Sequence, residues 1–426
     1  MDYLVGVVVV VVVLLASIAL HEVGHMVPAK RFGVRVSQYM VGFGPTLWSR
    51  TRGETEYGVK AIPAGGYVRL VGMYPTAQAV GDPPVRSAWS RLAADARAAS
   101  AEEIHPGEDH RAFYRLSTPK KLVVMLGGPV MNLLIAAVLL TVVYVGIGVP
   151  AASTTVASVA DCVLPADATA CTAEDPPGPA AEAGLRAGDR VVAFDGTPVD
   201  SWDALSALIR EAGGRADVPL VVERDGARVT LDVTPAVAER PVLAEDGTTS
   251  TATVGYLGVS AATVTERVSP LAVPGLLAER TWGTAEVVAT LPARFVDLAE
   301  RTFTGQERDL TSIVGPVGIT RFGGEIAAAD AGAALEVASL LELLAGLNIA
   351  LFVFNLLPLP PLDGGHVVAA LWEGASRRLA RVRGRERLRP FDTARLVPVA
   401  YGVFLLMGGM GLVVLYADVV NPVRLG

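Results

Sequence analysis

Residues 3–25 read YLVGVVVVVVVLLASIALHEVGH, an unbroken apolar run that ends in two histidines and a glutamate. An α-helix needs about 20 apolar residues to cross the hydrocarbon core of a bilayer, so we expect a membrane-spanning helix over 1–26. No Lys or Arg precedes the run, whereas Lys30, Arg31 and Arg35 follow it. A signal peptide carries its positive charge before the apolar segment, so we interpret this one as a retained helix whose N-terminus lies outside the cell.

The remaining apolar segments predict a core of about four membrane-spanning helices. The three further segments are 122–148, 334–357 and 396–416. The connections differ in charge: 27–121 contains 14 Lys and Arg, 374–395 contains eight, and 146–335 contains 13 Lys and Arg against 26 Asp and Glu. Because Lys and Arg are enriched in cytoplasmic loops, we place the first and third connections in the cytoplasm, and the acidic one and both termini outside.

The composition agrees with a membrane protein and excludes several other classes. Of the 426 residues, 51% are hydrophobic and 19% are charged, against about 25% charged in a typical soluble domain. A disordered chain is excluded, and so is a disulfide scaffold, because there are only two cysteines. The net charge of −7 argues against a nucleic-acid-binding protein. Cys162 and Cys171 both lie in the acidic exterior segment, where a disulfide can persist, with two free thiols as the alternative.

The motif His21-Glu22-Val23-Gly24-His25 places ionisable side chains at the end of the first apolar run. Residues i and i+4 share one face of a helix, so His21 and His25 can bind one metal ion. Glu22 is then placed beside the metal, where it can take a proton from water. Zinc with three protein ligands and one open position suits peptide hydrolysis. The alternative is a pair of pore-facing or interfacial histidines.

The stretch 355–366, NLLPLPPLDGGH, supplies candidates for a third ligand. Three prolines and two glycines cannot continue a regular helix, and irregular backbone at membrane depth lines a cavity or packs inside the protein. We therefore expect Asp363 to be the third metal ligand and Asn355 to face the same interior. His366 is an alternative ligand, but its position after the glycine pair favours the start of a helix or an outer position.

Taken together, these motifs resemble the bacterial site-2 protease family, which are intramembrane zinc metalloproteases of the regulator-of-sigma type with a PDZ domain. The matching stretches are HEVGHMVPAKRFGVRVSQYMVGFGPTLWS (21–49), IPAGGYVRL (62–70), GGPVMN (127–132), VGPVGI (314–319) and NLLPLPPLDGGH (355–366). The resemblance implies that His21, His25 and Asp363 bind Zn²⁺ and that Glu22 is the catalytic base. Asn355 matches a family asparagine that assists substrate or oxyanion binding.

Two cytoplasmic segments and one helix face carry further expectations. Residues 55–71 predict a hairpin-like element around Pro63 and the following glycine pair. In the family such a loop pairs with the unwound substrate, while an ordinary hairpin is the alternative. Residues 73–118 have no clear periodicity, and we expect a polar, mobile insertion. Gly127 and Gly128 favour close helix packing, and Asn132 can make an interhelical hydrogen bond near the site.

The exterior segment contains a second recognisable pattern. Residues 180–202, AAEAGLRAGDRVVAFDGTPVDSW, resemble a bacterial PDZ signature, and 220–235 predict a hairpin with an Asp-Gly turn. We expect a PDZ domain over 154–260. Such a domain captures an extended peptide and could admit only substrates already shortened by another protease. A structural domain without a ligand is the alternative.

The predicted protein is an α-helical polytopic membrane protein with a re-entrant β-rich loop and an extracytoplasmic PDZ domain. Its segments are helix 1–26, cytoplasmic region 27–121, helix 122–148, PDZ domain 154–260, linker or amphipathic region 261–333, helix with the Asp363 motif 334–366, basic cytoplasmic loop 367–395 and helix 396–416.

In the bacterial cell membrane, the expected function is cleavage of single-span membrane proteins in or near their transmembrane segment. The resemblance implies trimmed anti-sigma factors or remnant signal peptides as substrates, with the active site near the cytoplasmic face. A membrane-anchored PDZ scaffold with a vestigial metal site and a metal transporter are the alternatives. Neither requires a base such as Glu22 beside the metal.

Overall fold

The computed structural model describes residues 2–163, 171–172, 175–243, 249–308, 311–384 and 389–423. The chain forms two compact units. The first consists of Met1–Ile147 together with Val268–Gly426, and the second of Gly148–Arg267. The second unit includes the whole range predicted for the PDZ domain.

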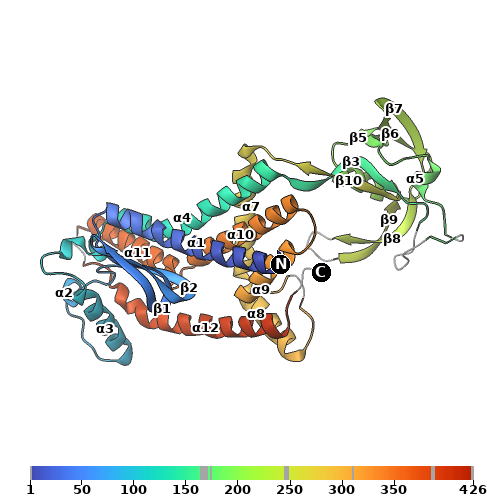
Figure 1. The fold of residues 1–426 in the computed structure, drawn as a ribbon. Coiled ribbons are helices and arrows are strands. Elements are labelled where there is room, and N and C mark those ends of the chain that lie inside the picture. The colour runs from blue at the N-terminus through green and yellow to red at the C-terminus, as the bar shows by residue number, and fades with distance from the viewer. Residues whose placement is uncertain are drawn as a thin grey trace. The chain divides into compact units, whose positions relative to one another are not determined.

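Four helices of the first unit are long and apolar enough to cross a membrane (Figure 1). They are α1 (Asp2–Arg31), α4 (Thr118–Thr141, continued by the π-helical turn Val142–Ile147), α10 (Ala333–Asn355) and α12 (Val397–Val420). Within this unit α1 packs against α4, and α4 packs against α10. The chain is thus a multi-pass membrane protein, as the apolar segments predicted.

Two polar connections contain more regular structure than the sequence patterns indicated. The range 367–395, predicted as a basic loop, is largely helical, because α11 runs over Asp363–Val382. Its buried Glu373 forms an ion pair of 2.7 Å with the buried Lys121 of α4, which holds the helix against the membrane core. Arg385 and Arg387 of this connection lie outside the described residues.

The range 73–118, predicted as a mobile insertion, contains the helices α2 (Ala77–Val80) and α3 (Ala88–Glu102). Ser87 and Ser90 form a capping box at the start of α3, and Ala-rich sequences favour helix once such a cap is present. Buried Arg97 binds both carboxylate oxygens of Asp392, at 3.0 and 2.6 Å. This pair joins α3 to the segment before α12, a contact across 295 residues that local sequence patterns cannot reveal.

Strands β1 (Val36–Arg52) and β2 (Thr55–Leu70) form the predicted β-rich loop, but with a different register. The turn lies at Gly53, whose φ of +64° favours glycine, and not at Pro63 and the glycine pair. Residues 36–41 of β1 pair with both 66–70 and 56–59 of β2. The two pieces that flank Pro63 therefore lie on either side of β1 instead of pairing with each other. Among the described strands only β1 pairs with 66–70, so one side of that piece is open.

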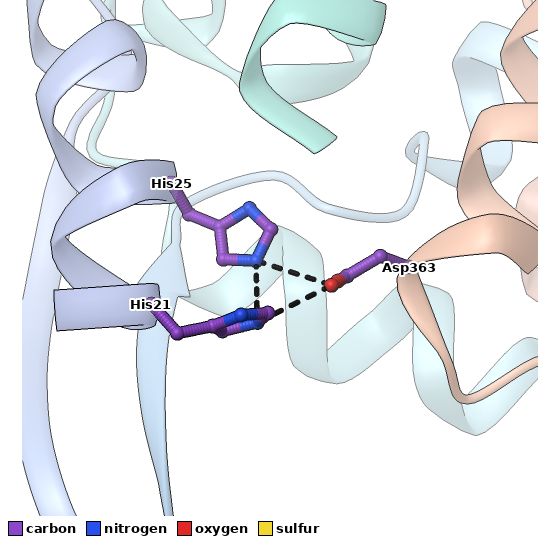
Figure 2. A group of neighbouring side chains, drawn as sticks. All are labelled: His21, His25 and Asp363. Carbon is purple, nitrogen blue, oxygen red and sulfur yellow. Dashed lines mark hydrogen bonds and ion pairs between the residues drawn. The ribbon is translucent and has the colours of Figure 1, made fainter. Parts of the chain in front are cut away.

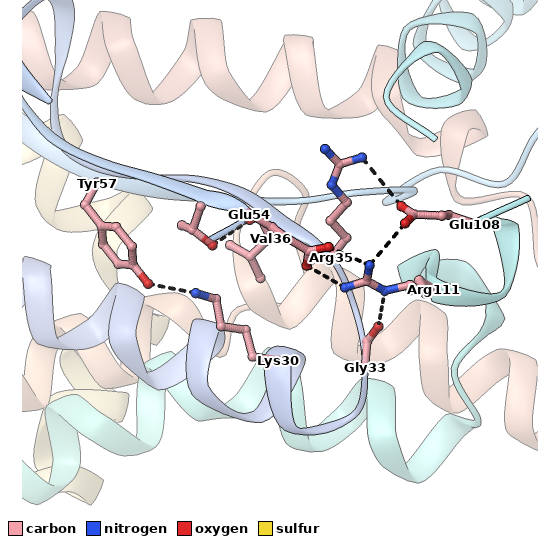
Figure 3. A network of polar contacts seen from close by, with 9 residues as sticks. Lys30, Gly33, Arg35, Val36, Glu54, Tyr57, Glu108 and Arg111 are labelled. Carbon is pink, nitrogen blue, oxygen red and sulfur yellow. Dashed lines mark hydrogen bonds and ion pairs between the residues drawn. The ribbon is translucent and has the colours of Figure 1, made fainter. Parts of the chain in front are cut away.

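A polar network holds the base of this β-loop against the end of α1 (Figure 3). Arg111 donates to both carboxylate oxygens of Glu54, at 2.7 and 2.6 Å, and to the carbonyl of Gly33 at 3.3 Å. The hydrogen bond from Arg111 holds the pKa of the exposed Glu54 carboxyl below its usual range. Buried Thr55 donates to the carbonyl of Val36 at 2.7 Å, which fixes the start of β2.

The range 261–333, predicted as a linker or amphipathic region, contains three helices. They are α7 (Val273–Ala289), α8 (Leu291–Thr304) and α9 (Pro316–Ala327). The VGPVGI motif begins α9, where the N–H of Gly318 donates to the buried Asp418 of α12 at 2.9 Å. Arg308 forms an ion pair with the same carboxylate at 3.4 Å. The motif thus fastens one end of α12.

The second unit is built on an antiparallel sheet in the order β10-β3-β4-β6-β7, with β5 paired to β4. Its strands are β3 (Val149–Val159), β4 (Arg190–Phe194), β5 (Thr197–Pro198), β6 (Val218–Arg224), β7 (Ala227–Val233) and β10 (Val259–Glu266). The unit also contains α5 (Pro179–Glu182), α6 (Trp202–Glu211) and the hairpin β8 (Ala236–Leu243) and β9 (Thr249–Tyr256). Phe194, Leu205 and Leu220 form the centre of its core.

Two local predictions for the second unit are confirmed. β6 and β7 form the hairpin expected around the Asp-Gly turn, and both turn residues have positive φ. Cys162 and Cys171 form a disulfide. Asp189 links the turn before β4 to β6, because its carboxylate accepts from Arg224 at 2.7 Å and from the N–H of Arg186 at 2.8 Å.

Candidate metal centre

Three side chains from two distant parts of the sequence lie close together in the first unit (Figure 2). His21 and His25 project from one face of α1, and Asp363 is the first residue of α11. Nε2 of His21 lies 3.2 Å from Nε2 of His25, and Oδ2 of Asp363 lies 3.3 Å from each of these nitrogens. The structure thus brings together the three side chains that the sequence predicted as metal ligands.

The geometry and chemistry of the cluster fit a zinc ion. Tetrahedral zinc with bonds of about 2.0–2.2 Å has ligand atoms about 3.3–3.6 Å apart, close to the three distances found here. Nδ1 of His25 donates to the carbonyl of Val124 at 2.8 Å, so its Nε2 carries the free lone pair. Oδ2 of Asp363 is buried and accepts no hydrogen bond from the described residues. Three electron-pair donors thus face one point.

Glycines on α4 make room for this point. A Cβ on Gly128 would lie 2.2 Å from Nε2 of His25 and 2.7 Å from Nε2 of His21. At the two preceding residues, a Cβ on Gly24 would lie 2.2 Å from the carbonyl oxygen of Gly127, and a Cβ on Gly127 would lie 2.0 Å from that of Gly24. The main chains of α1 and α4 therefore touch directly, which confirms the predicted packing role of Gly127 and Gly128.

A second pair of glycines positions Asp363. The chain between α10 and α11 folds back on the first turn of α11. A Cβ on Gly364 would lie 2.2 Å from the carbonyl of Leu357, and one on Gly365 would lie 2.6 Å from the nitrogen of Pro360. Only residues without a Cβ allow the chain to pass so close to the first turn of α11. This path of the chain directs Asp363 towards α1.

A cavity of about 650 Å³ opens beside the three side chains and contains most of the other predicted site residues. Glu22, Asn355 and His366 line it. Gly66 of β2 lies against Glu22, since a Cβ on Gly66 would lie 3.2 Å from Cγ of Glu22. His366 lies in the first turn of α11, and among the described residues it does not join the three-residue cluster.

The opposite wall of the cavity was not predicted. Residues 66–70 of β2 form one side, and the other side is formed by Ala96, Ala99 and Ser100 of α3 together with Glu103, which directly follows the helix. Ser100 fixes α3 to the chain after β2, since its hydroxyl accepts from the Tyr74 N–H and donates to the Tyr74 carbonyl. Small side chains on a helix carry no sequence signal for lining a site, so only the tertiary structure places α3 here.

Comparison with known proteins also identifies the chain as similar to zinc-dependent peptidases. The model of peptidase family M50 matches residues 9–397. The chain is 38% identical to the zinc metalloprotease Rip1 of Mycobacterium tuberculosis strain H37Rv, with 100% of both chains covered. It is 34% identical to Rip1 of Mycolicibacterium smegmatis, covering 99% of this chain and 98% of that protein. To the zinc metalloprotease RasP of Bacillus licheniformis it is 26% identical, over 82% and 85% of the two chains.

Proposed function

The chain belongs to peptidase family M50, the site-2 proteases, and is a zinc metalloprotease, and from this we propose the roles of its site residues. His21, His25 and Asp363 hold the zinc ion, and Glu22 is the general base. The observation that carries this assignment is the equal spacing of the three ligand atoms, with Glu22 in the adjoining cavity.

When bound, zinc polarises the scissile carbonyl and makes water more acidic at neutral pH. Glu22 accepts the proton of the attacking water on its carboxylate and returns it to the leaving amine. Asn355 ends α10 and donates its amide to the Leu351 carbonyl at 3.0 Å, which holds the side chain at the cavity. From there it assists the substrate carbonyl or the oxyanion, a contact typically worth about 3 kcal/mol.

The substrate binds in extended form along residues 66–70 of β2. A transmembrane helix has its carbonyls engaged in hydrogen bonds, so it must unwind before attack. This piece lines the cavity, its only strand partner among the described residues is β1, and its Gly66 lies against Glu22. Strand addition at this edge would present successive peptide bonds to the site, which supports the predicted role of the 55–71 region.

The substrates are single-span membrane proteins, cleaved in or near the bilayer after another protease has shortened them. Trimmed anti-sigma factors and remnant signal peptides are the substrate classes, and no nucleic acid is involved. The Lys and Arg distribution supports an active site near the cytoplasmic face, with both termini and the second unit outside. Family membership favours this function over a scaffold or a metal transporter.

The second unit is a PDZ domain that selects shortened substrates. Its strand β10 pairs only with β3 among the described strands, so one edge is available for an extended peptide. Deleting 154–260 is expected to speed cleavage of an untrimmed substrate while a trimmed one is cleaved as before. Unchanged slow cleavage of the untrimmed substrate would contradict the selecting role.

The central test compares the wild type with Glu22→Gln in purified full-length protein. Bound zinc and cleavage of a model transmembrane segment are measured on the same samples. We expect the variant to retain zinc and to lose cleavage at least about 100-fold, because general-base catalysis contributes about 10²–10⁴-fold. Glu102→Gln, at an exposed position on α3, is the matched control and keeps full activity. Equal cleavage by Glu22→Gln and wild type would refute the mechanism.

A further inference from the structure

One buried asparagine near the metal centre is left unexplained by the proposed roles. Asn132 on α4 is 1% exposed, and neither its Nδ2 nor its Oδ1 has a hydrogen-bond partner among the described residues. Burying an amide without partners costs several kcal/mol in an apolar environment. A buried polar side chain of this kind therefore calls for a polar partner close by.

Helix geometry places Asn132 beside His21. α1 and α4 run antiparallel. His25 contacts Val124, whereas Gly128, which follows Val124 by one turn, also faces His21, which precedes His25 by one turn. Asn132 follows Gly128 by one helical turn on the same face of α4. It therefore lies one turn beyond the metal centre, towards the start of α1.

The directions of the side chains bring the two residues together. Helical side chains lean towards the N-terminus of their own helix. In an antiparallel pair these directions oppose each other, so the side chain of Asn132 leans back along α4 towards Gly128, where a Cβ would lie 2.7 Å from Nε2 of His21. The two side chains therefore approach the same level between the helices.

A third helix, α10, contributes a polar side chain to the turn of α1 that precedes His21. Ser17 precedes His21 by one turn of α1, and its hydroxyl accepts from Nδ2 of Asn348 on α10 at 3.1 Å. Asn348 is fully buried and also donates to the carbonyl of Leu344 at 2.8 Å. A polar pair thus joins α1 and α10 one turn from the metal centre, near the turn of α4 that carries Asn132.

Among the described residues, the buried polar atoms here that lack a hydrogen-bond partner include both donors and acceptors. Besides those of Asn132, they are Nδ1 of His21 and Oδ1 of Asn348. When Nε2 of His21 binds a metal, its Nδ1 carries a proton and needs an acceptor. Oδ1 of Asn132 would supply that acceptor, and Nδ2 of Asn132 would then donate to Oδ1 of Asn348. Two donors and two acceptors would be satisfied at once.

We propose that Asn132 is a positioning residue for the metal centre, which accepts the Nδ1 proton of His21 and so fixes its tautomer and ring orientation. This inference rests on the proposed zinc ligands. Val124 already does the same for His25 through its main-chain carbonyl. Each histidine ligand would then be oriented by a different turn of α4.

The test measures zinc affinity, which a purely structural role of Asn132 would not change selectively. Full-length wild type, Asn132→Leu and Asn132→Asp are titrated with zinc against a chelating indicator at neutral pH. Loss of such an outer partner typically weakens metal binding about 10–100-fold, and we expect this for Asn132→Leu. Asn132→Asp keeps an acceptor of the same length and is expected to bind zinc within about threefold of the wild type or more tightly.

Asn348→Leu is the matched control, since it also removes a buried asparagine but leaves the proposed acceptor for Nδ1 of His21 in place. We expect it to weaken zinc binding several-fold less than Asn132→Leu does. Equal zinc affinity of Asn132→Leu and wild type would overturn the proposal, and so would an equal or larger loss in Asn348→Leu. If Asn132→Leu does not fold, Asn132→Ala replaces it with the same expectation, because it introduces no bulk.

The outcome also separates this inference from the proposed function. If the wild type itself binds no zinc, or if His21→Ala binds it as tightly as the wild type, the ligand assignment fails. If both of these controls behave as expected and Asn132→Leu keeps its zinc affinity, only the role of Asn132 fails.

Discussion

Replacing Gly128 by alanine tests whether the contact between α1 and α4 sets the geometry of the metal centre. The added methyl group would lie 2.2 Å from Nε2 of His25, whereas ordinary contact begins at 3.4 Å, so the atoms must separate by about 1.2 Å. The neighbours are a ligand ring held by Val124 and a main chain that already touches α1 at Gly24. Neither has a flexible end that could move aside.

A displacement of this size exceeds what zinc coordination tolerates. Ligand distances in functional sites stay within about 0.2 Å of their standard values. We therefore expect Gly128→Ala to bind zinc at least 100-fold more weakly and to cleave a transmembrane substrate at a rate below detection. Overpacking costs about 1–3 kcal/mol, so the fold survives and the loss is local.

The assay determines zinc by elemental analysis of the purified protein and follows substrate cleavage on the same preparation. Gly346→Ala on α10 is the matched control, because a Cβ there meets no atom within 4 Å. This control should keep both zinc and activity. One bound zinc per chain and near-normal cleavage in Gly128→Ala would refute the assigned geometry.

Two further predictions concern buried ion pairs. Removing the carboxylate in Asp189→Asn should lower the free energy of unfolding of the isolated 148–267 unit by about 2–3 kcal/mol at pH 7, as measured by denaturant titration. Because Arg224 lowers the pKa of Asp189 below its unfolded value of about 3.9, this difference should be complete above that pH and vanish as the pH falls through the folded pKa. Breaking the buried pair in Arg97→Ala should cost about 3–5 kcal/mol and speed amide hydrogen exchange in α3, whereas the reversed pair Arg97→Asp with Asp392→Arg should recover part of the protection. Unchanged exchange in Arg97→Ala would show that this pair does not hold α3 in place.

The local patterns of the sequence were sufficient to predict the membrane helices and the three clustered side chains. The helical spacing of His21 and His25 needs no tertiary information, and the prolines before Asp363 make a return of the chain towards the interior plausible. Both inferences depend on backbone rules that act over a few residues.

Features that depend on distant contacts were not predictable in the same way. In the pairing of β1 with β2, residues 36–41 lie between two pieces of β2 and pair with both, and the similar β-propensity of these pieces does not reveal this arrangement. The place of α3 at the cavity depends on the pair between Arg97 and Asp392. Because neither residue has a local pattern that identifies its partner, the sequence predicted a mobile segment where the structure has a wall of the site.

The direct main-chain contact at Gly24 and Gly127 also has a consequence for the surrounding lipid. Helices adjust to a thinner or thicker bilayer by changing their tilt. At most helix crossings side chains can repack to absorb such a change, but here two backbones meet without any between them. A change of tilt between α1 and α4 would act directly on His21 and His25. The hydrolytic rate in vesicles should therefore depend on acyl-chain length, with an optimum at the thickness that matches this crossing.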